Sequence, residues 1–252
     1  MRFLKIKCYG AFNSFRQPDF HTYHKTLPLP PKTTVAGMIG SALGISPIEV
    51  NDQWLRADRF KMGVVGKHYG QANDLWQIRK YENKHLNKYK KGEEKRPYKT
   101  AVIVRELLYG LNLTLYLTFS DSADFDAIKS ALSNPKWALS LGREDELIRI
   151  SSMNEVELKK KEKGLYIFKD TIIPGDVNEL GYRPVLEDGV KGNLLQKAPR
   201  IVNLPSFFDT KRNSEARIPT KYQKFTFISS LPISLEEDCY YDDFDNQFFF
   251  IF

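Results

Sequence analysis

The sequence is poor in the residues from which disulfide frameworks and zinc sites are built. In 252 residues it has two cysteines, Cys8 and Cys239, and four histidines. Two isolated cysteines exclude a disulfide framework and a zinc ribbon, so we expect a reducing, cytoplasmic location. His21 and His24 are close in sequence, but a metal site would need further ligands. We therefore predict no metal site and no other cofactor.

Long apolar segments are also missing. The densest apolar run covers only 248–252, whereas a membrane-spanning helix needs about 20 consecutive apolar residues. Lys5 and Lys7 interrupt the N-terminal segment too often for the apolar core of a signal peptide. We therefore expect no membrane partner.

Positive charge, in contrast, is in excess. The chain has 38 lysines and arginines against 31 aspartates and glutamates, which gives a net charge of +7. A basic balance favours polyanionic partners, because each neutralised phosphate releases condensed counterions. The hydrophobic share of 42% is ordinary for a globular protein with a buried core.

Periodicity predicts an ordered series of elements over residues 1–150. In chain order these are strand 2–9, helix 33–44, strands 100–109 and 111–119, helix 122–132 and strand 147–150. Gly110 separates the two middle strands, which predicts a hairpin. The order is that of a ferredoxin-like fold, which RNA-recognition modules use. We therefore predict an α+β, ferredoxin-like (RRM-like) RNA-binding domain over residues 1–150.

The first helix is expected to begin at Thr33 or Thr34, either of which can act as its cap. Gly37, Gly40 and Gly44 lie within it or at its end, where glycine costs about 1 kcal/mol relative to alanine, so we expect close packing there. After residue 150 the chain changes character, with strand-like pieces separated by a loop-rich stretch at 174–205. This pattern predicts a β-rich C-terminal lobe over 151–252, with strand-like pieces at 165–173, 222–231 and 247–252.

Most of the excess charge is concentrated in one segment. Its basic residues are Arg79, Lys80, Lys84, Lys88, Lys90, Lys91, Lys95, Arg96 and Lys99. Only three glutamates oppose these nine residues, and Trp76, Tyr81, Tyr89 and Tyr98 are interspersed. Cations that hold phosphates and rings that stack on bases suit single-stranded nucleic acid. We predict a basic β-hairpin thumb at 76–99, inserted into the core; the alternative is a solvated charged loop.

Two local motifs resemble a known family. The first comprises 10–15 (GAFNSF) and 28–44 (PLPPKTTVAGMIGSALG), and the second is 137–145 (WALSLGRED). Together they resemble the Cas-five family of CRISPR-associated proteins, in the repeat-associated RNA-binding (RAMP) superfamily. That family has a first strand, a Pro-rich loop ending in Thr, a glycine-studded helix and a later Leu-Gly-Arg-like loop.

The resemblance implies a function without catalysis, in antiviral defence. Such a subunit of a type I, Cascade-type RNA-guided complex binds and caps the 5′ handle of the guide RNA (crRNA). Its implied partners are the backbone and large subunits of the complex, and target DNA near the PAM. RNA contacts are expected from the basic thumb residues and from the two motifs, at Lys32, Thr33, Thr34, Gly142 and Arg143.

Physical chemistry supports these two motif sites, although each has an alternative role. Unpaired N–H groups at a helix N-terminus favour phosphate, but Thr33 and Thr34 can instead be simple caps. A glycine before Arg143 lets RNA approach the backbone and leaves a guanidinium for a phosphate or base edge. Alternatively, Arg143 pairs with one of the acids at 144–146.

Two other functions remain open. The resemblance also allows an enzyme, because one branch of this family is itself a metal-independent ribonuclease that trims precursor guide RNA and has a Tyr on the first helix and an adjacent Lys-His pair. Here Lys67-His68 and Lys84-His85 are such pairs, but 33–44 contains no Tyr and Tyr23 is the nearest substitute. The other alternative is a general RNA-binding module outside CRISPR. We expect no enzymatic activity.

Overall fold

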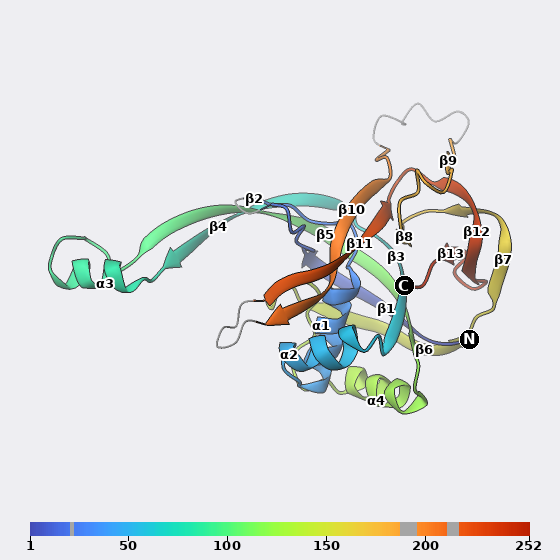
Figure 1. The fold of residues 1–252 in the computed structure, drawn as a ribbon, viewed down its shortest axis with the longest axis horizontal. Helices are drawn as coiled ribbons and strands as arrows, with labels where there is room; N and C mark the ends of the chain where they lie inside the picture. Colours follow the sequence, from blue (N-terminus) through green and yellow to red (C-terminus); the bar gives the residue numbers. More distant parts are fainter. Residues whose placement is uncertain (21–22, 187–195, 211–216) are drawn as a thin grey trace.

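The computed structural model describes residues 1–20, 23–186, 196–210 and 217–252 (Figure 1). His21 and part of the predicted loop-rich stretch at 174–205 lie outside these residues. The fold is mixed, with antiparallel strands forming most of it, so the α+β class is confirmed at this level. None of the helices in the described ranges is long and apolar enough to cross a membrane.

A nine-stranded sheet forms the body of the molecule, in the order β10-β11-β8-β3-β5-β1-β6, with β2 and β4 also paired to β5. Its strands are β1 (Arg2–Asn13), β2 (Tyr23–His24), β3 (Phe60–Lys67), β4 (Gly70–Lys80), β5 (Lys99–Phe119), β6 (Ile148–Glu157), β8 (Thr171–Pro174), β10 (Arg200–Thr210) and β11 (Arg217–Ile228). Strands β1, β5 and β6 contain the strands predicted for residues 1–150, whereas β3 was not predicted from the sequence.

Two twelve-residue helices, α1 (Lys32–Leu43) and α4 (Ser122–Ser133), cover one face of this sheet (Figure 1). The apolar residues that alternate along β1 and β5 point to this face and are buried in the main core. They are Leu4, Ile6, Cys8, Leu111, Leu113, Leu115 and Leu117. The period-two pattern in the sequence therefore identified the residues that face the main core, but the opposite face is also partly covered, since Lys5 and Tyr116 are buried as well.

The start and the glycines of α1 differ in part from expectation. Pro31, and neither Thr33 nor Thr34, occupies the cap position, and no side chain caps the helix. Gly40 has the expected close contact, because a Cβ there would collide with the Val50 side chain in a short π-helical turn, η1 (Val50–Arg56), which follows α2 (Pro47–Glu49). Gly37 faces open space, so the expectation of close packing is wrong at that position.

The predicted hairpin around Gly110 is wrong, because β5 is one continuous strand from Lys99 to Phe119. Gly110 has a φ of 63° and the ring of Tyr69 lies against it. It therefore introduces a local left-handed kink and not a chain reversal. The first half of β5, residues 99–109, forms a hairpin with β4, with Gly70 opposite Tyr109 and Lys80 opposite Lys99.

Strands β4 and β5 form a long arm that projects from the body and carries the helix α3 (Asn83–Lys90) at its tip (Figure 1). The paired strands begin at Gly70, so the hairpin extends further toward the body than the predicted 76–99. The basic segment lies in the outer part of this arm, where a helix takes the place of a simple turn.

The segment 151–252 is β-rich but contributes to two sheets. Strands β8, β10 and β11 extend the main sheet, and their apolar residues join its core. The second sheet contains β7 (Lys160–Phe168), β9 (Arg183–Pro184), β12 (Ile233–Asp242) and β13 (Gln247–Phe249). The strand-like piece expected at 165–173 is thus divided between two sheets, with a turn at Asp170.

A buried polar network fastens the end of β12 to the main sheet. Tyr116 on β5 donates a 2.7 Å hydrogen bond to Asp242, and Lys5 on β1 pairs with both Asp242 and Asp245. Lys7 pairs with Asp245 at 2.7 Å. Burial alone would raise the pKa of Asp242, but hydrogen bonds from Lys5 and Tyr116 hold that pKa below its usual value.

Asp170, at the turn between the sheets, has no ion-pair or hydrogen-bond partner for its side chain among the described residues. Its φ is 52°, and burial raises the pKa of its carboxyl to about 6. Because the native pKa lies above the unfolded one, ionisation is disfavoured in the folded state. The resulting destabilisation is absent below about pH 4 and fully present above about pH 6.

We predict that Asp170→Asn raises the free energy of unfolding by about 1–3 kcal/mol at pH 8. Asparagine keeps the size of the side chain and tolerates left-handed backbone. Urea unfolding at pH 8 and at pH 3.5 measures the effect, which should disappear at the lower pH. An equal gain at both values would show that the backbone, and not the titration of the carboxyl, is responsible.

Candidate nucleic-acid interface

The two sequence motifs meet in one groove beside α1. Thr33 and Thr34 from the first turn of the helix and Gly142 and Arg143 from the loop after α4 line this groove, whose volume is about 610 Å³. Strand β10 closes another side with Leu204 and neighbouring residues. Tertiary structure thus brings together four of the residues predicted to contact RNA.

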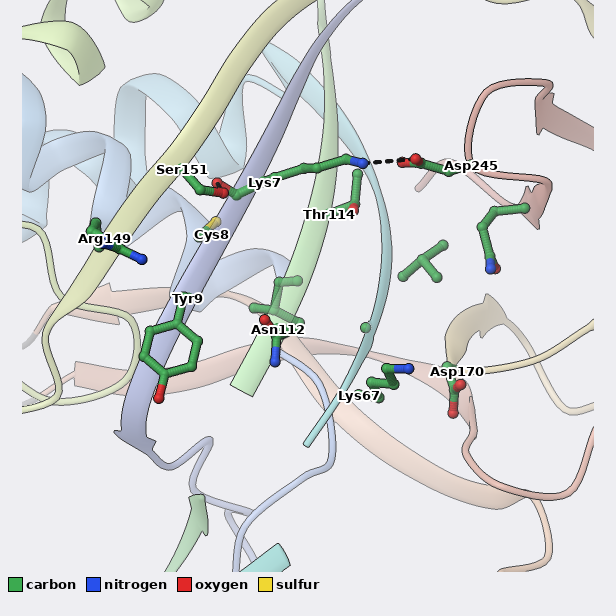
Figure 2. Close-up of a pocket in the computed structure, with 14 residues that line it drawn as sticks. Lys7, Cys8, Tyr9, Lys67, Asn112, Thr114, Arg149, Ser151, Asp170 and Asp245 are labelled. Atoms are coloured by element: carbon green, nitrogen blue, oxygen red, sulfur yellow. Dashed lines mark hydrogen bonds and ion pairs between the residues drawn. The ribbon is translucent and has the colours of Figure 1, made fainter. Parts of the chain in front are cut away.

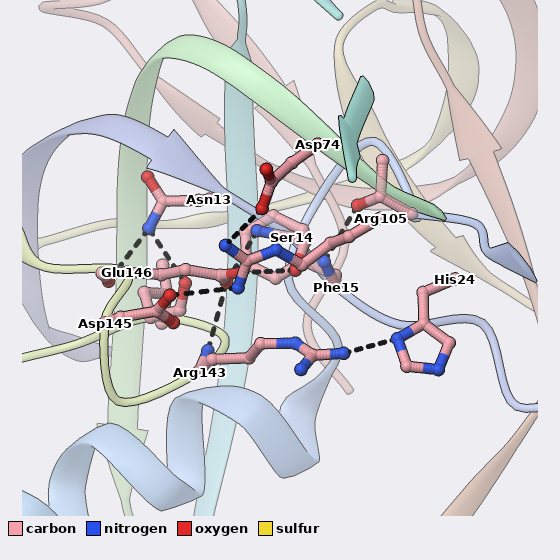
Figure 3. Close-up of polar contacts among 11 residues, drawn as sticks. Asn13, Ser14, Phe15, His24, Asp74, Arg105, Arg143, Asp145 and Glu146 are labelled. Carbon is pink, nitrogen blue, oxygen red and sulfur yellow. Dashed lines mark hydrogen bonds and ion pairs between the residues drawn. The ribbon is translucent and has the colours of Figure 1, made fainter. Parts of the chain in front are cut away.

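The loop that carries Arg143 is held by the buried carboxylate of Glu146 (Figure 3). This carboxylate accepts hydrogen bonds from the backbone N–H and hydroxyl of Ser14, at 2.7 and 2.5 Å, and from the Arg143 N–H at 3.0 Å. Gly142 has a φ of 123°, and a Cβ there would collide with the same carboxylate. Only glycine therefore fits this position. Burial raises the pKa of Glu146, although the hydrogen bonds oppose that shift.

Arg143 itself makes no ion pair with Glu144, Asp145 or Glu146, so the acid-pairing alternative does not occur in the structure. Its Nη2 lies 2.6 Å from Nδ1 of His24 (Figure 3). Its guanidinium lies 4.8 Å from the ring centroid of Trp76 on the arm. Burial lowers the pKa of Arg143. A half-buried guanidinium without a carboxylate partner is a suitable site for an anion.

A second arginine, missed in the sequence, pairs with the acids. Arg105 on β5 contacts Asp145 and Asp74, each at 3.0 Å, and lies 5.5 Å from the Trp76 ring centroid. It joins the base of the arm to the Arg143 loop. Periodicity shows that Arg105 belongs to a strand, but no local pattern indicates these partners.

The basic residues of the arm are exposed to solvent. Lys84 pairs with Glu82 at 2.6 Å; the other eight predicted cations between 79 and 99 make no ion pair with any described residue. Arg79 lies 5.2 Å from the Tyr98 ring, whose centroid is also 5.2 Å from that of Tyr81. The arm therefore presents unneutralised cations next to partly exposed rings.

Lys32 differs from the other predicted contacts. Its Nζ pairs with Asp58 at 2.6 Å and lies 5.1 Å from the Phe60 ring centroid. It lines a different cavity from the one that contains Arg143. The structure therefore gives Lys32 a local partner instead of placing it in the groove.

His85 does not share a site with the other ribonuclease candidates. His85 is buried in α3, 3.1 Å from Glu94 at the tip of the arm, whereas the Tyr23 hydroxyl donates to Asn73 near its base at 3.3 Å. His68 lies at the body end of β4, with Nδ1 2.9 Å from the Gly70 carbonyl. Over the described ranges, no three His, Cys, Asp or Glu side chains are placed to hold a metal ion.

Comparison with known proteins identifies the family. A family model described as "CRISPR-associated protein (Cas_Cas5)" matches residues 3–218, so the chain belongs to the CRISPR-associated Cas5 family. This confirms the resemblance seen in the sequence motifs. The comparison with curated proteins finds no match.

Two solved structures show the same overall fold. One is a chain of a CRISPR RNA-guided surveillance complex, with 17% identity, a TM-score of 0.53, and coverage of 94% of this chain and 91% of that one. The other is a CRISPR protein from Archaeoglobus fulgidus, with 14% identity, a TM-score of 0.52, and coverage of 99% and 98%.

Neutralising the arm should weaken RNA binding. We predict that replacing Lys84, Lys88, Lys90 and Lys91 with Gln reduces the slope of log affinity against log salt by up to about 2.8, since each single-strand phosphate contact contributes about 0.7. Fluorescence anisotropy with single-stranded RNA at several salt concentrations measures the slope. A quadruple variant with the parental slope would identify the segment as a solvated loop.

Proposed function

We propose that this protein is a non-catalytic subunit of a type I CRISPR RNA-guided surveillance complex (Cascade) and that it binds and caps the 5′ handle of the guide RNA. One observation carries the proposal: the groove combines the start of α1 with Gly142 and Arg143 at the base of an arm, and eight of the nine cations at 79–99 farther out on this arm make no ion pair with a described residue. Family membership supports a role in CRISPR defence over a general RNA-binding module.

The groove offers complementary groups for one end of an RNA strand. The N–H group of Thr33 in the first turn of α1 has no hydrogen-bond acceptor among the described residues, and it favours phosphate. Arg143 supplies a charge-assisted donor, and Trp76 beside it supplies a ring for a base. The basic arm then holds the following phosphates. Binding, orientation and protection of the RNA end need no further chemistry.

A ferredoxin-like core is the framework in this proposal. The order β3-β5-β1-β6, with every neighbouring pair antiparallel and α1 and α4 on one face, supports it. The arm is then an insertion between the second and third core strands. Such a core leaves one sheet face and the loops at one end available for ligands.

The remaining subunits of the complex are proposed partners. The fold is shared with a chain of an RNA-guided surveillance complex, which supports contacts with backbone and large subunits. Target DNA near the PAM belongs to the same proposal. The projecting arm suits contact with a neighbouring subunit, because its strands are exposed well outside the body (Figure 1).

Arg143→Ala should reduce binding of handle-containing RNA about tenfold to a hundredfold, because a charge-assisted hydrogen bond contributes about 1.5–3 kcal/mol. Assembly of the complex should fall with it. The isolated subunit should stay folded, since the guanidinium makes no ion pair with a described residue.

Arg183→Ala is the matched control, because Arg183 is an exposed arginine on β9 in the second sheet. Binding titrations and co-purification with the other subunits compare the two variants. Normal binding and assembly with Arg143→Ala would remove this residue from the RNA site.

The purified protein should not cut RNA. A metal-free ribonuclease needs an acid, a base and a cation around one phosphodiester, and the structure separates His85 from Tyr23 along the length of the arm. Labelled precursor repeat RNA should be bound without product, with or without chelator. A single defined cleavage, abolished by His85→Ala, His68→Ala or Tyr23→Phe, would establish the ribonuclease alternative.

A further inference from the structure

A second cavity lies on the face of the main sheet opposite α1 and α4 (Figure 2). Its volume is about 560 Å³, and β1, β3, β5 and β6 contribute to its lining. Lys7 and Tyr9 line it, whereas Leu4 and Ile6 of the same strand are buried in the core under the helices. By the alternation of a strand, this cavity and the Arg143 groove use different surfaces.

Two cations in this cavity have no ionic partner. Lys67 on β3 and Arg149 on β6 are exposed and make no ion pair with a described residue. Lys7, in contrast, is neutralised by Asp245 at 2.7 Å. Asp170 at the edge of the cavity makes no ion pair with a described residue, although the charge of Lys67 acts to lower the pKa of its carboxyl. The cavity therefore has two cations available for an external anion and one carboxylate that opposes it.

Aromatic rings continue from the cavity toward the arm. Tyr9 lines the cavity, and three positions further along β1 Phe12 contacts Tyr109 of β5, with ring centroids 5.4 Å apart. Phe12 and Tyr109 are 47% and 49% exposed, and Tyr69 beside them is 72% exposed. Half-exposed rings of this kind contribute little to the core and offer stacking surfaces for unpaired bases.

We propose that this face binds a second segment of single-stranded nucleic acid, with a phosphate between Lys67 and Arg149 and a base on Tyr9. The next base stacks on the Phe12–Tyr109 pair. Free cations beside polar groups and one ring match a nucleotide, whereas an apolar protein partner would require an apolar lining. A paired duplex would not expose its base faces to these rings.

This site goes beyond the proposed function, because it lies on the opposite face of the sheet from the Arg143 groove, which is proposed to bind the guide-RNA handle. Two kinds of single-stranded nucleic acid could bind at this site: a stretch of guide RNA and a displaced strand of DNA. Both supply phosphates and unpaired bases. Oligouridine and oligothymidine of the same length distinguish them.

The test uses the full chain with Lys84, Lys88, Lys90 and Lys91 replaced by Gln, so that the arm contributes less to binding. In this background, Lys67→Gln with Arg149→Gln should lower the log–log salt slope for oligonucleotide binding by about 1.4, the value for two phosphate contacts. Lys159→Gln with Lys163→Gln is the control, since it removes the same charge next to or on β7. Equal slopes for the two double variants would overturn the proposal.

Two further measurements have independent readouts. Asp170→Asn should strengthen binding about twofold, because it removes a carboxylate near the bound phosphate. Photocrosslinking with a 5-bromouracil oligonucleotide should label Tyr9, Phe12 or Tyr109, and the label should be lost with Lys67→Gln and Arg149→Gln. Crosslinks confined to the arm and the Arg143 groove would contradict the second site. Arg143→Ala should leave these crosslinks in place, which separates this proposal from the handle-binding one.

Discussion

The buried carboxylate of Glu146 is the interaction on which the interface depends. It receives two hydrogen bonds from Ser14 at the end of β1 and one from the backbone of Arg143. It thereby joins the first sequence motif to the second across the chain. Its position also requires glycine at 142, because any side chain there would collide with it. The direction in which Arg143 points is a consequence of this bonding.

Pairing with carboxylates divides the cations into two groups. Lys5, Lys7 and Arg105 are neutralised by acids, and they join β12 to the main sheet or the arm to the body. Arg143 and most of the basic arm have no such partner among the described residues. Cations of the first group hold the structure together, whereas those of the second are available to phosphate. A net charge of +7 alone does not distinguish the two.

The same sheet organises both proposed nucleic-acid surfaces. One face is covered by α1 and α4, and the Arg143 groove opens where the first turn of α1 meets the Arg143 loop. The other face is partly covered by the end of β12, and the cavity around Tyr9 remains open beside it. The arm extends from the body formed by this sheet (Figure 1). A nucleic-acid strand bound at the base of the arm would therefore lie near both proposed surfaces.

The sequence alone determined the features that depend on local chemistry. Alternation identified the buried faces of β1 and of the inner half of β5, helical spacing located α1 and α4, and composition located the basic segment. The motifs pointed to the family. These features can be predicted from the sequence because side-chain periodicity and charge are properties of short segments and do not depend on which distant segment packs against them.

Tertiary structure decided which segments pair. Periodicity does not specify a partner, so Gly110 suggested a hairpin where β5 continues and pairs with β4. The division of 151–252 between two sheets and the partners of Arg105 likewise depend on contacts between distant residues. Arg105, remote in sequence, pairs with Asp145, and Arg143 makes no ion pair with that acid. Only the folded chain brings these groups together.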